Sequence, residues 1–154
     1  MQSIPGLLQE ELRQLEAFIA HLRHEQEAIK CRDAQKLNKA ILDKSALLES
    51  LNQLEANRNA LLKARGFGAD RDGVDAWLDR HDSQGEARRQ WSELLSRAKQ
   101  AKELNDLNGR LIAIHLQATQ EVLAAISPPK VPTTLYGANG QVSAPTGNRI
   151  IDAA

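Results

Sequence analysis

The longest helical pattern in this chain lies at residues 86–126, which read EARRQWSELLSRAKQAKELNDLNGRLIAIHLQATQEVLAAI. The stretch contains no proline, and its apolar side chains recur at the three- and four-residue spacing of an α-helix. Ser83 and Glu86 form a capping-box pattern at the start, and Ser127-Pro128-Pro129 stops the helix near Ile126. At 1.5 Å per residue this predicts a helix roughly 60 Å long. We therefore expect an elongated molecule.

The two halves of this helix differ in the width of their apolar surface. From Glu86 to Lys102 the apolar side chains occupy a narrow arc, which one neighbouring helix can cover. From Leu104 to Ile126 they spread over more than about 200°. We expect the second half to contact two or more neighbours and to be the part most sensitive to substitution.

Two further long helices are predicted before this one. Leucine and isoleucine at heptad spacing, with Gln26 as one polar member, indicate a helix from Pro5 to Lys30. A second helix is predicted to run from its N-cap Asp33 to Arg65 and to end at Gly66. The short connection between the two fits either an antiparallel helix pair or a kinked continuation.

The segment between Gly66 and Gly85 has a loop composition that surrounds a short helix from Val74 to Arg80. We expect Phe67 and Trp77 to close one end of the molecule. The predicted fold class is all-α: an elongated antiparallel helical bundle, or coiled coil, of three long helices and one short helix, with a flexible tail at the carboxyl end.

Residues 1–126 are expected to form the helical bundle domain, and residues 127–154 a flexible partner-binding tail. The tail holds four of the five prolines and few large apolar residues. Within it, Leu135, Tyr136 and Gly137 place an apolar and aromatic pair in a polar stretch, and exposed aromatic side chains of this kind often anchor a partner. The alternative is a marginal hairpin at an Asn-Gly turn.

Charge and hydropathy exclude several classes of partner. Twenty basic and twenty acidic residues cancel and are interspersed, so nucleic acid is not an expected partner. No window of the sequence is apolar enough to insert into a membrane, and the first residues do not resemble a signal peptide. A single cysteine, Cys31, fits a reducing compartment. We expect a cytoplasmic protein.

No motif for catalysis, cofactor binding or metal binding stands out. None of the four histidines follows a glutamate at the spacing of a di-iron bundle, and phosphate-binding and dinucleotide-binding motifs are missing. We therefore expect no enzyme activity, no cofactor and no metal. Asn105, Asn108 and His115 interrupt the broad apolar arc of the long helix. They either fix the helix register or contact a bound segment.

The long leucine-rich helices, the neutral charge, the stretch from Thr134 to Gly140 and the terminal Arg149-Ile150 together resemble the FlgN family of flagellar export chaperones. The resemblance implies a protein without catalytic activity. It also implies partners: members of that family bind hook-filament junction proteins (hook-associated proteins) in the cytosol, prevent their early assembly and deliver them to the type III export gate.

The broad apolar half of the long helix suits capture of an amphipathic helical segment of such a cargo. The expected partner-binding residues are Leu111, Ile114 and His115 on this helix, with Leu135, Tyr136 and Gly137 in the tail contacting the cargo or the cytoplasmic domain of the gate. Two alternatives remain. The first predicted helix could cover the same surface in a simple three-helix bundle, or the protein could be a structural coiled-coil adaptor or homodimer without export cargo.

Overall fold

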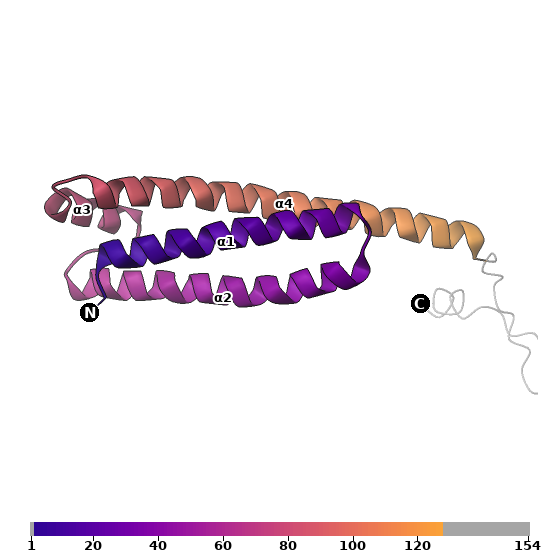
Figure 1. Ribbon diagram of the computed structural model, residues 1–154, viewed down its shortest axis with the longest axis horizontal. Coiled ribbons are helices and arrows are strands. Elements are labelled where there is room, and N and C mark those ends of the chain that lie inside the picture. Colours follow the sequence, from indigo (N-terminus) through magenta and orange to yellow (C-terminus); the bar gives the residue numbers. More distant parts are fainter. Residues whose placement is uncertain (1, 128–154) are drawn as a thin grey trace, which may run out of the picture. The chain divides into compact units, whose positions relative to one another are not determined.

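Figure 1 shows the computed structural model of the chain, which describes residues 2–127. This part contains four helices and no strand: α1 (Ile4–Lys30), α2 (Ala34–Ala64), α3 (Arg71–His81) and α4 (Glu86–Ile126). The chain divides into a first unit, Met1–His115, and a second unit, Leu116–Ala154, and α4 contributes residues to both. The predicted all-α class and the three long helices are confirmed.

In the first unit, α1 and α2 form an antiparallel pair of 27 and 31 residues (Figure 1). The chain reverses direction at Arg32, which adopts a positive φ of 54°. The carboxylate of Asp33 then accepts a hydrogen bond from the Lys36 amide at 3.0 Å and caps α2 as predicted. Of the two connections that the sequence left open, the structure therefore has the hairpin.

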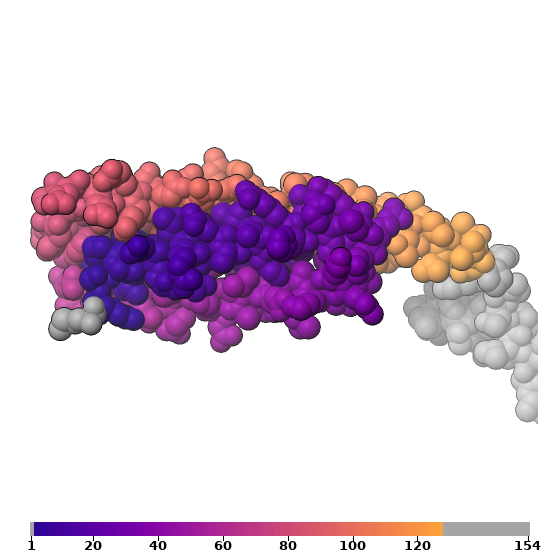
Figure 2. Space-filling view, in the orientation of Figure 1, coloured from indigo at the N-terminus to yellow at the C-terminus, as the bar shows by residue number. Residues whose placement is uncertain are grey.

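The first residues of α4 lie beside the first residues of α1, and Asn108 further along α4 bonds to Leu22 of α1. These two helices are therefore parallel, and α2 is antiparallel to both. Figure 2 shows α1, in indigo and purple, lying between α2 and the salmon part of α4 on one face of the unit. The first unit is thus an elongated up-down-up bundle in which α1 is the central helix.

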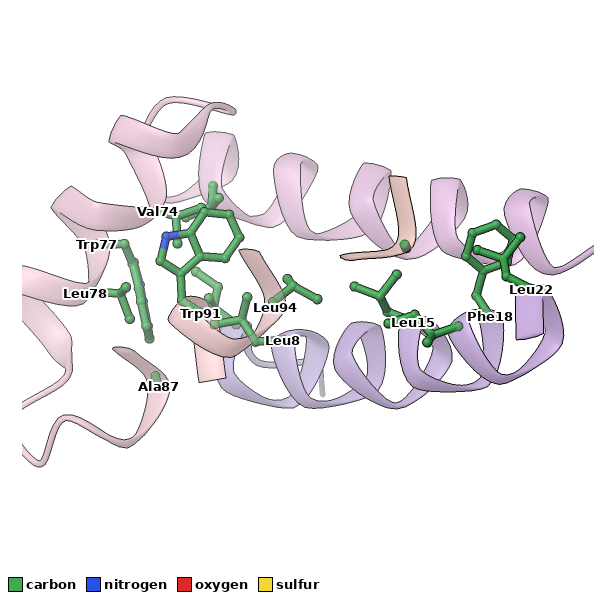
Figure 3. Close-up of a cluster of buried hydrophobic side chains, with 14 residues drawn as sticks. Leu8, Leu15, Phe18, Leu22, Val74, Trp77, Leu78, Ala87, Trp91 and Leu94 are labelled. Atoms are coloured by element: carbon green, nitrogen blue, oxygen red, sulfur yellow. The ribbon is translucent and has the colours of Figure 1, made fainter. Parts of the chain in front are cut away.

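The core runs along α1, as Figure 3 shows from Leu8 to Leu22. The predicted heptad positions are largely confirmed, because most of the predicted leucine and isoleucine positions on α1 are buried. One position is wrong: Gln26 is half-buried, and its neighbour Glu25 is fully buried instead. The buried apolar residues of α1 are Ile4, Leu7, Leu8, Leu15, Phe18, Ile19, Leu22, Ala28 and Ile29.

The short helix α3 closes one end of the core, as predicted. Trp77 is only 5% exposed and stacks on His81 with ring centroids 5.0 Å apart, and Phe67 meets the edge of His81 at 5.8 Å. The helix begins earlier than predicted because the Asp70 carboxylate accepts a hydrogen bond from the Gly73 amide at 2.8 Å. A side chain at Gly73 would place its Cβ 2.0 Å from the carbonyl oxygen of Gly68, so this contact requires glycine.

The bounds predicted for α4 are confirmed, but its predicted cap is wrong. Asp82, not Ser83, caps the helix: its carboxylate accepts from the amides of Ala87 at 3.3 Å and Arg88 at 2.8 Å. The reason is a tight turn after α3, in which Gly85 takes a φ of 73° and brings Asp82 over the first amides of α4.

The width of the apolar arc predicted that the second half of α4 is more buried than the first half. The structure shows the opposite. The buried apolar residues of α4 are Ala87, Trp91, Leu94 and Ala101, all in the half before Leu104. In the second half only Asn108 is buried. In the first unit only the side of this half that faces α1, marked by Asn108, is covered. Leu104, Leu111 and Ile112 on that side are half-buried, whereas Leu107 and Ile114 lie off it and are exposed.

Candidate functional site

The part of α4 that belongs to the second unit carries a row of exposed aliphatic side chains, which we call the apolar stripe: Leu116, Val122, Leu123 and Ile126. Their exposed fractions lie between 53% and 73%. At 100° per residue they fall within an arc of about 120°. Large aliphatic side chains aligned on one helix face are typical of surfaces that recognise another helix.

The residues that the sequence predicted as partner-binding fall into two groups. Leu111, Ile114 and His115 lie on one face of α4 in the first unit, because their spacing is three and four residues. Ile114 is 59% exposed, whereas Leu111 and His115 are half-buried. The second group, Leu135, Tyr136 and Gly137, lies outside the described residues.

A buried polar network ties the three long helices together at Asn108. The Asn108 side-chain amide donates to the backbone carbonyl of Leu22 at 2.8 Å and to the Glu25 carboxylate at 3.0 Å. Lys44 of α2 donates to the same carboxylate at 3.3 Å and to the Asn105 side-chain carbonyl at 3.2 Å. A buried asparagine bonded to its neighbouring helix holds one register. These contacts support the register interpretation for Asn105 and Asn108.

A second buried charged pair was missed in the sequence. Glu11 and Arg58 are 5% and 6% exposed, Arg58 donates to the Glu11 carboxylate, and the guanidinium also lies 5.2 Å from the Trp91 ring centroid. Burial raises the pKa of Glu11 to about 7, against the opposing effect of Arg58. The available signal was the position of Glu11, which lies on the same face of α1 as Leu8 and Leu15.

The described residues hold no cluster of three or more side chains able to bind a metal. His21, which the sequence places one turn before His24, lies with Nε2 2.6 Å from the Ala40 carbonyl and so links α1 to α2. Cys31 is exposed and is the C-cap residue of α1. Within residues 2–127, no helix is both long and apolar enough to cross a membrane.

Comparison with known proteins points to one family. The family model described as FlgN protein matches residues 1–144. The chain is 28% identical over 144 residues to the "Flagella synthesis protein FlgN" of Proteus mirabilis. The aligned region covers 92% of this chain and 90% of that protein. It is 38% identical over 53 residues to the protein of the same name from Escherichia coli strain K12, covering 34% of this chain and 38% of that protein. No solved structure matches.

Proposed function

Because the chain belongs to the FlgN family, we propose that it is a chaperone for the export of flagellar hook-filament junction proteins. In this proposal it binds those proteins in the cytosol, prevents their early assembly and delivers them to the cytoplasmic domain of the type III export gate. It catalyses no reaction. The observation that carries the proposal is the exposed apolar stripe. It lies on a chain that matches the FlgN family model over residues 1–144.

The chemistry of the stripe suits an amphipathic helical segment of the cargo. Burial of apolar surface stabilises a complex by about 25 cal/mol per Å² before the costs of association. Four aliphatic side chains on one face offer this gain to a helix with its own aliphatic row, and the polar face of α4 stays in water. A cargo helix held in this way is no longer available for assembly, which is the action expected of an export chaperone.

The residues predicted from the sequence keep their roles in the proposal. Leu111, Ile114 and His115 form a second contact for the cargo, with Ile114 as the most exposed of the three. Leu135, Tyr136 and Gly137 contact either the cargo or the export gate. In this proposal the helical bundle of residues 1–126 binds the cargo, and the tail of residues 127–154 contacts the cargo or the gate.

The proposal is tested by pull-down from the native cytosol with the full chain as bait, followed by mass spectrometry. We expect hook-filament junction proteins to be recovered by the natural protein and to be depleted with Leu123→Glu, which places a charge in the stripe. Gln117→Glu adds the same charge on the polar face of the same helix and should leave recovery unchanged. If the bait recovers only further copies of itself, the protein is a structural homo-oligomer, and the chaperone proposal is wrong.

A further inference from the structure

Asn108 and Gly109 form an Asn-Gly pair in the interior of α4, and packing does not explain the glycine. Gly109 is exposed, and a Cβ added at this position would meet no neighbouring atom within 4 Å. Glycine also weakens a helix interior, because it loses more conformational freedom on folding than other residues lose. Asn108, in contrast, is fully buried and bonded to α1. The pair therefore joins a residue that holds α4 in place to a residue that the fold does not require.

Asn-Gly is the sequence at which an asparagine side chain most readily loses ammonia. The backbone nitrogen of the glycine attacks the side-chain carbonyl carbon of the asparagine, since no Cβ hinders the approach. This nitrogen loses its proton to water and bonds to Cγ, the bond between Cγ and Nδ2 breaks, and ammonia leaves. Water then opens the resulting succinimide ring at one of its two carbonyls. The product is aspartate or isoaspartate, so a neutral amide becomes a carboxylate.

The folded structure holds Asn108 in a position that blocks this attack. Within α4 the Gly109 amide donates to the Asn105 carbonyl, so its nitrogen is engaged in the helix. The Asn108 side-chain amide donates to the Leu22 carbonyl at 2.8 Å and to the Glu25 carboxylate at 3.0 Å, which fixes the side chain against α1. Its oxygen, Oδ1, would carry the negative charge during the attack, and it is buried without a hydrogen-bond donor from the described residues. The reaction therefore requires that α4 first opens at this point.

The product of the reaction does not fit the closed position. Replacement of Nδ2 by oxygen turns the donor of both hydrogen bonds into an acceptor, which would face the oxygen atoms of Leu22 and Glu25 at 2.8 and 3.0 Å. Glu25 is fully buried, and its carboxylate lies 3.0 Å from the Lys44 ammonium. Two carboxylates that share one cation in a buried site repel each other. Isoaspartate would also insert a carbon atom into the backbone of α4.

We propose that Asn108 is a deamidation site that is protected while α4 packs on α1 and becomes reactive when α4 opens there. The reaction makes the opening permanent, because the new carboxylate excludes the return of α4 to its contacts with Leu22 and Glu25. Each opening of α4 thus exposes the bundle to irreversible loss of its closed form. The inference concerns the first unit and does not depend on what the protein binds.

The rate of the reaction is measured by incubation of the full chain at pH 8, in buffer and in guanidinium chloride, followed by digestion and mass spectrometry. The digest separates Asn108 from Asn139, which also precedes a glycine. We expect Asn108 to convert at least tenfold more slowly in buffer than in denaturant. Gly109→Ala, for which the structure has room, should slow the conversion at least tenfold in denaturant, where packing plays no part.

Two variants remote from the site test whether the opening of α4 controls the rate. Leu94 is buried in the core that α4 shares with α1, so Leu94→Ala should raise the rate at Asn108 in buffer at least threefold. Leu123→Ala, at an exposed position of the same helix, should leave this rate unchanged. If Leu94→Ala does not fold, the milder Leu94→Val takes its place.

The effect of the product is tested by substitution. Asn108→Asp should lower the melting temperature below that of Asn108→Ala, which removes the same donor without adding a charge. The matched control is Asn105→Asp, which adds the same charge one turn earlier, at an exposed position whose side chain accepts from Lys44. This control should leave the melting temperature nearly unchanged.

Three results would overturn the proposal. The first is that Asn108 does not convert in denaturant, or converts as fast in buffer as in denaturant. The second is a rate in buffer that the substitution at Leu94 raises no more than Leu123→Ala does. The third is that the Asn108→Asp chain melts at as high a temperature as the natural chain.

Discussion

At the scale of single residues, the buried ions show how the bundle tolerates charge in an aliphatic core. A buried carboxylate costs several kcal/mol in lost hydration unless a cation and hydrogen bonds offset the loss. The Glu25 carboxylate accepts hydrogen bonds from Lys44 and Asn108, whereas the Glu11 carboxylate accepts from Arg58. Each carboxylate has one oxygen without a hydrogen bond, and that of Glu25 lies 3.0 Å from the Lys44 ammonium. The Glu11 carboxylate therefore has fewer hydrogen-bond donors around it than the Glu25 carboxylate has.

The burial of Glu11 predicts a pH dependence of stability. The pKa of Glu11 is raised to about 7 in the folded protein from an ordinary value of 4.5, so the folded state binds the additional proton between these values. The free energy of unfolding should therefore fall as the pH rises through this window, by on the order of 1 kcal/mol or more. Urea unfolding at pH 5 and pH 8 measures the change, and Glu11→Gln should remove this part of it. An equal pH dependence in both proteins would mean that other groups cause it.

The heptad pattern predicted which face of α1 is buried but not which charges lie within it. Glu25 and Gln26 are adjacent, and either could occupy the seam by spacing alone. The choice depends on Asn108 and Lys44, which lie 83 and 19 residues away in sequence. Similarly, the heptad spacing shows that Glu11 is a polar residue beside the leucine seam. It does not show that its partner is Arg58, which comes from another helix.

At the scale of helices, α4 should be sensitive to substitution in its first half and tolerant in its second. Leu94 is 6% exposed, and Leu94→Ala should cost about 2 to 5 kcal/mol of unfolding free energy. Leu123 is 53% exposed, and Leu123→Ala should cost less than about 1 kcal/mol. Chemical denaturation of the two variants measures both values. If Leu123→Ala cost more unfolding free energy than Leu94→Ala, the second half of α4 would be the more sensitive half, as the width of its apolar arc predicts.

The network at Asn108 gives a second prediction for helix packing. Asn108→Ala removes a donor from the buried Glu25 carboxylate and the side-chain bond to the Leu22 carbonyl, which keeps its helical partner within α1. The loss should cost about 1 to 3 kcal/mol. Asn105→Ala removes one exposed hydrogen bond with Lys44 and should cost less than about 1 kcal/mol. Thermal melting of the two variants compares them. Equal effects would show that Asn108 does not hold the register of α4.

The bounds of the long helices were predictable because caps and helix stops are local. Asp33 caps the start of α2, and Gly66 adopts a positive φ just after its end, as their residue types predict. The cap of α4 was not predictable in the same way, since a turn brings Asp82 over the helix start and displaces the expected role of Ser83. The width of an apolar arc indicates how much surface is available for burial, but not whether a neighbouring helix reaches it.

At the scale of the whole molecule, the all-α class followed from long proline-free helical patterns and an aliphatic composition. The helix hairpin did not follow, because a three-residue connection fits two geometries. For the predicted site, Ile114 is an exposed aliphatic residue, as a partner contact requires. Nothing in the sequence pattern singled out the stripe residues Val122 and Leu123 as a separate surface.

The tail makes a prediction of its own. Tyr136→Ala should leave the melting temperature of the free protein nearly unchanged and weaken binding to cargo or export gate by at least about 1 kcal/mol, because an exposed aromatic anchor contributes to binding and not to the core. Paired thermal melting and calorimetry measure the two quantities. A loss of several kcal/mol in stability would place Tyr136 in the core, and unchanged affinity for both partners would remove it from the docking site.

Calorimetry of the full chain against a purified hook-filament junction protein, at several temperatures, measures whether the chain binds such a cargo through exposed apolar helix surface, as we propose. We expect saturable binding with a negative heat-capacity change, because association removes apolar surface from water. We also expect Leu123→Glu to weaken this binding at least tenfold and Gln117→Glu to leave it unchanged. If the natural chain does not bind at tens of micromolar, or if Leu123→Glu leaves the binding intact, the chain does not recognise this cargo through the apolar stripe.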